Sequence, residues 1–123
     1  MREKIKILYV DDEPINLMLF EHTFQAKYET KIASSGWDGL EELHNDSGIK
    51  IVISDMRMPG MNGLEFITQA KEMYPHILFY ILTGYDISEE IATALKDGLI
   101  NKYFQKPFKM VEIDKAISEA FSI

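Results

Sequence analysis

The stretch KILYVDDEPINLML, Lys6–Leu19, changes abruptly from apolar to acidic residues and then back to apolar ones. Its first part, Ile7–Val10, has the uninterrupted apolar composition of a strand that is buried in a protein core. The acids Asp11–Glu13 follow at once, with no basic residue among them. Pro14 suits the first turn of a helix, and one of the last two acids would lie near its N-cap. The stretch therefore predicts a buried strand, an acidic turn and a helix.

Apolar runs of similar length recur along the chain. The predicted strands are Ile5–Val10, Tyr28–Ala33, Ile49–Ile53, Ile77–Leu82 and Ile100–Phe104. The first, third and fourth are almost continuously apolar, which is typical of strands that are covered on both faces in a parallel sheet. The second alternates between apolar and polar residues, so we expect it at an edge of the sheet.

Segments with helical spacing separate the predicted strands. The clearest apolar stripe consists of Met110, Ile113, Ile117, Ala120 and Phe121. The segment from Trp37 to His44 contains Gly39, which costs a helix about 1 kcal/mol relative to Ala. Strands and helices thus alternate five times, and right-handed crossovers would place helices on both faces of the sheet. We therefore predict an α/β fold with a doubly wound, five-stranded parallel sheet.

The composition narrows the classes of function. With 123 residues, 46% of them hydrophobic, the chain suits one compact domain, residues 1–123, with a single core. A net charge of −7 argues against nucleic acid as a direct partner. The absence of cysteine excludes a disulfide framework, a thiolate zinc site and a thiol nucleophile. Because the chain has no cysteine, we expect a cytoplasmic protein. The longest apolar run, Ile77–Leu82, is far shorter than the roughly 20 residues needed to span a bilayer, so we expect no membrane segment.

Polar residues gather where the predicted strands end. In open α/β sheets, ligands bind beyond the carboxyl ends of the strands. The chemically active residues at those ends are Asp11, Asp12, Asp55, Thr83 and Lys106. We therefore expect three carboxylates, one hydroxyl and one ammonium group to converge on one edge of the sheet.

Clustered carboxylates are costly unless a cation neutralises them. Oxygen ligands without His or Cys suit a hard ion, and Mg²⁺ is the usual one where phosphate chemistry occurs. A lysine on the opposite side would balance the remaining charge and could hold an anion. A carboxylate beside Mg²⁺ can act as a nucleophile toward phosphorus. The pattern therefore predicts a Mg²⁺-dependent site for phosphoryl chemistry.

The residues at the strand ends also match a known family. The chain resembles, over essentially its full length, the receiver domain of two-component response regulators. The pieces that carry the resemblance are VDDEP, DMRMPGMNG, LTG and KPF, each in order after a predicted strand. The resemblance implies a flavodoxin-like (βα)5 fold with strand order 2-1-3-4-5. It also implies a phosphorylation-controlled switch that catalyses only its own phosphorylation and dephosphorylation.

The resemblance further implies a role for each site residue. Asp55 matches the phosphoacceptor, which takes a phosphoryl group from the phosphohistidine of a histidine kinase or a histidine phosphotransfer protein. The matching Mg²⁺ ligands are Asp12, Asp55 and the backbone carbonyl of Arg57, with Asp11 acting mainly through water. The remaining matches are Thr83 for the hydroxyl that binds a phosphoryl oxygen, Lys106 for the ammonium, Tyr103 for the aromatic switch and Pro107 for a proline with a cis bond. Arg57 and Tyr85 occupy two positions that tune dephosphorylation in the family, and both are bulky here.

Other functions fit the sequence less well. An aspartyl-phosphate phosphatase of the haloacid dehalogenase kind would place its nucleophile in a D-x-D motif after the first strand, where Asp11–Glu13 stands instead. A nucleotide binder would need a glycine-rich phosphate motif, which the chain lacks. A phosphate-independent docking receiver is disfavoured by the intact acidic set. The stretch DDEPINLML, with Asn16, also resembles receivers joined to hybrid histidine kinases, and the sequence does not decide between a stand-alone chain and a module of a larger protein.

We expect the output surface to follow Thr83 along the chain. The fourth helix within Ile87–Leu99, the fifth strand Ile100–Phe104 and the fifth helix are the elements that a phosphoryl group on Asp55 could move most directly. This surface would contact an output domain or a partner protein, with a homodimer as a further possibility.

Overall fold

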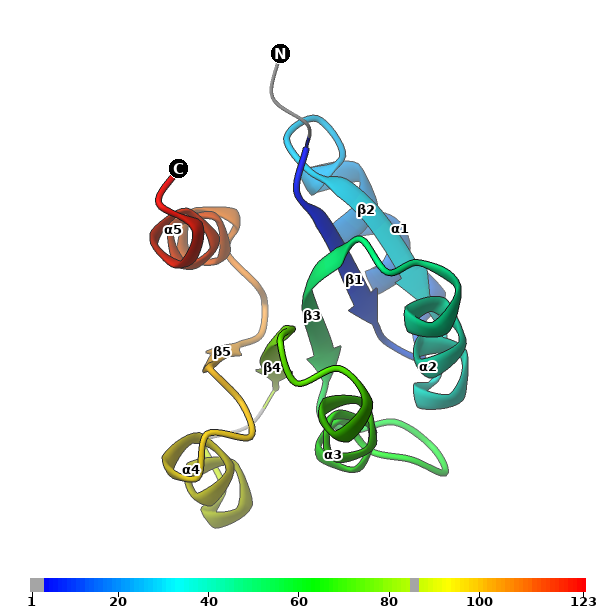
Figure 1. The fold of residues 1–123 in the computed structure, drawn as a ribbon, viewed down its shortest axis with the longest axis vertical. Helices are drawn as coiled ribbons and strands as arrows, with labels where there is room; N and C mark the ends of the chain where they lie inside the picture. Colours follow the sequence, from blue (N-terminus) through cyan, green and yellow to red (C-terminus); the bar gives the residue numbers. More distant parts are fainter. Residues whose placement is uncertain (1–3, 85–86) are drawn as a thin grey trace.

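The structure, a computed structural model, describes residues 4–84 and 87–123. Five strands alternate with five helices along these residues (Figure 1). The elements are β1 (Lys6–Val10), α1 (Pro14–Phe24), β2 (Glu29–Ala33), α2 (Gly36–Asn45), β3 (Ile49–Asp55), α3 (Gly63–Met73), β4 (Leu78–Thr83), α4 (Glu89–Lys96), β5 (Lys102–Gln105) and α5 (Met110–Phe121). The strands pair in parallel in the order β2-β1-β3-β4-β5, which confirms the predicted topology and the edge position of the second strand.

The sheet is covered on both faces, as the continuous apolar strands predict. Alternate residues of each central strand point to opposite faces. Leu8 and Val52 join one core cluster with side chains from α2, α3 and α4. Ile7 and Ile51 join a second cluster with side chains from α1 and α5. Three helices therefore lie on one face of the sheet and two on the other.

The fifth strand begins later than the sequence predicts. Ile100 is buried in the cluster beside α3 and α4 instead of pairing within the sheet. Asn101 contacts the backbone of Phe79 twice, because its N–H donates to the Phe79 carbonyl and its side-chain oxygen accepts the Phe79 N–H. The strand starts only at Lys102. The apolar run Ile100–Phe104 is thus part core anchor and part strand.

Close packing explains why a glycine, Gly39, lies inside α2. A Cβ atom at this position would lie 2.9 Å from the Phe66 ring and 3.1 Å from Val10. Helix α2 therefore packs closely on α3 and the sheet, and this contact offsets the low helix propensity of glycine.

The loop between β3 and α3 turns at Gly60, whose φ of 79° is readily adopted by glycine. A Cβ atom on Gly60 would lie 2.5 Å from the ring of Trp37. The indole of α2 thus rests on the turn of the loop that follows Asp55, although Trp37 is also largely exposed to solvent.

None of the helices in the described ranges is both long enough and apolar enough to cross a membrane.

Candidate functional site

Three carboxylates meet at the carboxyl edge of the sheet. Asp11 follows β1 and Asp55 ends β3, and these strands are neighbours with Val10 opposite Ser54. Asp11, Asp12 and Asp55 each place a carboxylate oxygen within 4.8 Å of the others. Asp11 is fully buried, Asp55 is 6% exposed and Asp12 is half-buried. The sequence prediction that these three acids converge is confirmed.

Lys106 brings the predicted positive charge to this edge of the sheet. Its Nζ lies 3.0 Å from Asp55 Oδ1 and 3.6 Å from Asp11 Oδ2. Its backbone N–H donates to the Thr83 carbonyl at 2.8 Å, which fixes the segment after β5 to the end of β4. The Lys106–Pro107 bond is cis, as the family resemblance implied.

The electrostatics of the pair favour a charged lysine and a less acidic aspartate. Burial lowers the pKa of Lys106, but the Asp55 and Asp11 carboxylates outweigh it and raise this pKa overall. Burial raises the pKa of Asp55, Lys106 opposes that shift, and the charges of Asp11 and Asp12 add to it. The net effect on Asp55 is upward, so Lys106 only partly offsets the cost of burying this carboxylate.

Asp11 is held by hydrogen bonds on both of its oxygens. The Tyr9 hydroxyl donates to Oδ2 at 2.6 Å, and the Asn16 side-chain amide donates to the same oxygen at 3.2 Å. Oδ1 accepts the Glu13 N–H at 3.0 Å. Burial and Asp11 together raise the pKa of Tyr9, so the hydroxyl keeps its proton.

Sequence reasoning missed the contribution of Tyr9 to the site. A usable signal was present, because residues two apart in a strand point to the same face, and Tyr9 lies two positions before Asp11. The first helix was expected to have Asp12 or Glu13 near its N-cap. Glu13 is the N-cap residue, but its side chain makes no capping hydrogen bond.

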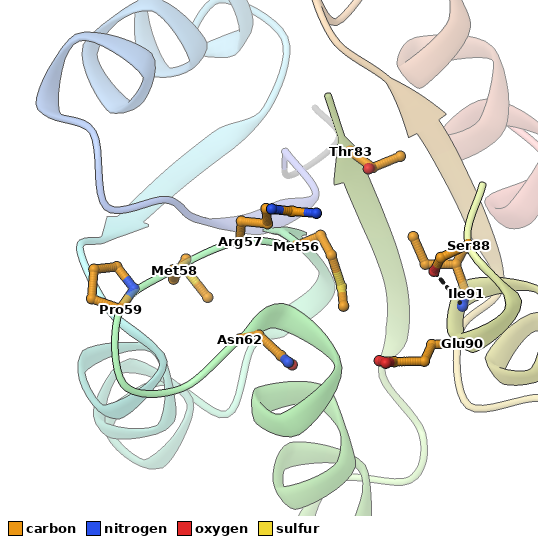
Figure 2. A pocket seen from close by; sticks show the side chains of 9 residues that line it. All are labelled: Met56, Arg57, Met58, Pro59, Asn62, Thr83, Ser88, Glu90 and Ile91. Carbon is orange, nitrogen blue, oxygen red and sulfur yellow. Dashed lines mark hydrogen bonds between the residues drawn. The ribbon is translucent and has the colours of Figure 1, made fainter. Parts of the chain in front are cut away.

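Thr83 ends β4 and is almost fully buried. Beside it lies a cavity of about 580 Å³ between the β3–α3 loop and the start of α4, lined by Met56, Arg57, Met58, Pro59, Asn62, Thr83, Ser88, Glu90 and Ile91. Figure 2 shows the Arg57 side chain extending from the loop toward the end of β4, where Thr83 lies. The cavity is therefore bordered by Thr83 and by Arg57, which lies two residues after Asp55 in the chain.

Tyr103 lies on the outer strand β5 and is 36% exposed. It lines a surface groove together with Ile87, Phe104, Gln105, Lys106, Pro107, Lys109 and Glu112. The ring is thus turned outward in this structure, and its inward movement stays a prediction. Tyr85, the second position that tunes dephosphorylation in the family, lies outside the described residues.

The response regulator receiver domain family matches residues 7–118. The chain belongs to this family, and so it is a receiver domain of the two-component response regulators. Sporulation initiation phosphotransferase F of Bacillus subtilis is 31% identical over 93% of this chain and 91% of its own length. Chemotaxis protein CheY1 of Helicobacter pylori strain J99 is 32% identical over 85% of this chain and 86% of its own length.

Some relatives are much longer than this chain. The hydrogenase transcriptional regulatory protein HoxA of Cupriavidus necator is 29% identical over 83% of this chain, which spans only 21% of that protein. Among solved structures, a receiver domain protein from Clostridium thermocellum has a TM-score of 0.88 at 31% identity, covering 95% of this chain and 94% of that one. An adenylate cyclase from Rhodopirellula baltica has a TM-score of 0.89 at 28% identity, covering 95% of this chain and 87% of that one.

Proposed function

We propose that Asp55 is the phosphoacceptor of this receiver domain. The observation that carries the proposal is the position of Asp55 at the end of β3, with Lys106 Nζ 3.0 Å from Oδ1 and two further carboxylates beside it. A nucleophilic carboxylate must be held near positive charge that can also bind the incoming phosphoryl oxygens. Among the three clustered acids, Asp55 has the shorter contact with Lys106 and borders the loop that forms the adjacent cavity.

The proposed reaction transfers a phosphoryl group from the phosphohistidine of a histidine kinase or a histidine phosphotransfer protein. A carboxylate oxygen of Asp55 forms the new O–P bond as the P–N bond to the imidazole breaks. The imidazole nitrogen leaves with the bonding electron pair. Lys106 and the Thr83 hydroxyl would each hold a phosphoryl oxygen, and Lys106 would remain charged because the acids around it raise its pKa.

A divalent cation fits the acidic cluster, and we propose Mg²⁺. The three acids supply only oxygen donors, two of them are buried, and one lysine cannot neutralise all three. Hard oxygen donors of this kind suit Mg²⁺ better than softer metals. Asp12, Asp55 and the Arg57 carbonyl would hold the ion directly, and Asp11 would hold it mainly through water. When bound, the ion supplies positive charge beside the phosphoryl oxygens.

The proposed output is a change of conformation and not the turnover of an external substrate. Thr83 would move toward the phosphoryl oxygens, and the Tyr103 ring would turn inward from its exposed position. The surface of α4, β5 and α5 would then bind an output domain, a partner protein or a second copy of the chain. We further propose that residues 1–123 form one receiver domain, working either alone or as a module of a longer regulator or hybrid kinase.

The central test is phosphorylation of the whole chain with acetyl phosphate and Mg²⁺, followed by intact mass spectrometry. We expect one acid-labile phosphoryl group on the wild type and none on Asp55→Asn. Asp97→Asn, which changes an exposed aspartate after α4, is the matched control and should be labelled like the wild type. Stoichiometric labelling of Asp55→Asn would refute the assignment.

A further inference from the structure

The carboxylate of Asp11 has little capacity left for a cation. Each carboxylate oxygen can accept about two hydrogen bonds. Oδ2 already accepts from Tyr9 at 2.6 Å and from Asn16 at 3.2 Å, and Lys106 Nζ lies 3.6 Å from it. Oδ1 accepts the Glu13 N–H. These hydrogen bonds, most of them on Oδ2, leave the Asp11 carboxylate less able to bind a cation or a water that the cation holds.

The Tyr9 hydroxyl is a fixed donor. Tyr9 is 1% exposed, and its ring stacks on Phe20 of α1 with centroids 4.2 Å apart and planes inclined by 10°. Tyr9 also pairs with Ile32 and Ile53 in the neighbouring strands. The ring cannot turn away from Asp11 without opening the packing between the sheet and α1, so this packing holds the hydroxyl beside the Asp11 carboxylate.

We propose that Tyr9, with Asn16, weakens the binding of a divalent cation by competing with it for the charge of Asp11. This inference rests on the metal-binding part of the proposed function. A donor that bonds to a charged oxygen draws on the same negative charge that attracts the cation, and such bonds are strong in a buried setting. Tyr9 is a positioning residue in this scheme, because it acts on the cation through Asp11.

The competition has two consequences with one cause. Without a cation, the Tyr9 hydroxyl lowers the cost of placing Asp11 beside Asp12 and Asp55. With a cation, the same bond reduces what the ion gains from Asp11. The hydroxyl and the cation are therefore negatively coupled, and removing either one should strengthen the effect of the other.

The experiment compares the whole wild-type chain with Tyr9→Phe, which keeps the ring on Phe20 and removes only the hydroxyl. Mg²⁺ binding is measured by calorimetric titration at neutral pH, and thermal melting is recorded in EDTA and in excess Mg²⁺. We expect Tyr9→Phe to melt lower than the wild type in EDTA. We also expect it to bind Mg²⁺ at least about fivefold more tightly, the lower end of ordinary coupling between two sites. Equal or weaker binding would overturn the inference.

Two further variants keep the result interpretable. Tyr28→Phe removes the hydroxyl that donates to Asp114, a tyrosine–aspartate hydrogen bond outside the acidic cluster. It should lose stability with no change in Mg²⁺ affinity, and an equal tightening here would overturn the inference.

Asn16→Ala removes a second donor to Asp11 Oδ2 and, like Tyr9→Phe, should bind Mg²⁺ more tightly than the wild type. If Tyr9→Phe does not fold, unchanged or weaker binding by Asn16→Ala decides against the inference.

The same measurements distinguish an incorrect metal site from an incorrect role of Tyr9. If the wild type and Tyr28→Phe both bind no Mg²⁺, the proposed metal site is wrong and the inference falls with it. If the wild type binds Mg²⁺ and Tyr9→Phe binds it no more tightly, the metal site stands and only the competition is refuted.

Discussion

Lys106, which directly follows β5, reaches across β4 to Asp55 at the end of β3. Its Nζ lies 3.0 Å from Asp55 Oδ1. This contact ties together two strands that do not pair with each other. Among the residues that the structure describes, Lys106 supplies the one ammonium group of the acidic cluster. The contact places this group against the proposed phosphoacceptor.

Replacing Lys106 with Met should destabilise the cation-free protein. The change removes the positive partner of two buried carboxylates, and the loss of a charged hydrogen-bond partner costs about 1–3 kcal/mol. Urea unfolding in EDTA measures the effect. Lys109→Met is the matched control, because Lys109 is well exposed and its contact with Glu112 is long, at 3.9 Å. This variant should change the free energy of unfolding by less than about 0.5 kcal/mol. Equal losses in the two variants would contradict the role given to Lys106.

Mg²⁺ should raise the stability of the wild type because it relieves the repulsion among Asp11, Asp12 and Asp55. A ligand that binds only the folded state adds RT ln(1 + [L]/Kd), which is about 1.4 kcal/mol at ten times the dissociation constant. Melting curves in EDTA and in excess Mg²⁺ test this. Asp12→Ala should be neutral or stabilising in EDTA and should lose most of the response to Mg²⁺. Identical melting of the wild type in both conditions would show that the site does not form.

Asp55→Asn should be more stable than the wild type at neutral pH in EDTA. The pKa of Asp55 is raised in the folded protein, by burial first and then by Asp11 and Asp12 against the opposing effect of Lys106. The folded state thus holds the proton more tightly than the unfolded state, and wild-type stability falls as pH rises from the ordinary value, about 3.9, through the raised one. The advantage of the Asn variant should therefore shrink as pH is lowered through this window.

A second aspartate, Asp114, should give a change of the opposite sign in the free energy of unfolding, which is measured for both variants by urea unfolding. The pKa of Asp114 is lowered, chiefly by Lys27 and also by Tyr28. Its charged form therefore stabilises the fold above the ordinary value, and that contribution is lost as pH falls through the lowered pKa. Asp114→Asn should accordingly be less stable than the wild type at neutral pH. Shifts of the same sign for Asp55→Asn and Asp114→Asn in urea unfolding would refute this account.

Beryllofluoride, a mimic of the phosphoryl group, should change amide exchange across α4 and β5 as well as around Asp55. The reason is that Thr83 ends β4, next to β5, and its carbonyl is bonded to the Lys106 N–H. Changes confined to the loops around the acids would count against the proposed switch. Tyr103→Ala should weaken activation-dependent binding of a partner, and unaltered binding would exclude Tyr103 from the mechanism.

The fold and the acidic cluster were open to prediction because both follow from local rules. Continuous apolar runs indicate strands buried on both faces, and the acids directly after them must lie at one edge of a parallel sheet. The start of β5 was predicted wrongly because Ile100 has the composition of a strand residue, yet it packs beside α4. The hydrogen bond between Tyr9 and Asp11 was missed because Tyr9 counts as an apolar residue of the predicted strand, although its hydroxyl donates to Asp11.

Other features of the site depend on distances that a sequence does not contain. The contact of Lys106 with Asp55 depends on the backbone path after β5, where the Lys106 N–H bonds to the Thr83 carbonyl. The cavity beside Thr83 depends on how far the start of α4 stands from the β3–α3 loop. The outward position of Tyr103 likewise reflects side-chain packing and not composition.

The contact of Trp37 with Gly60 gives the molecule an optical probe of its own. Trp37 is the sole tryptophan of the 123 residues, and its ring rests on the loop that begins directly after Asp55. Indole emission depends on the polarity and motion of what surrounds the ring, so events at the acidic cluster should be readable as a change in fluorescence without any label. A stopped-flow trace of the unmodified protein could then time the arrival of a cation or a phosphoryl group.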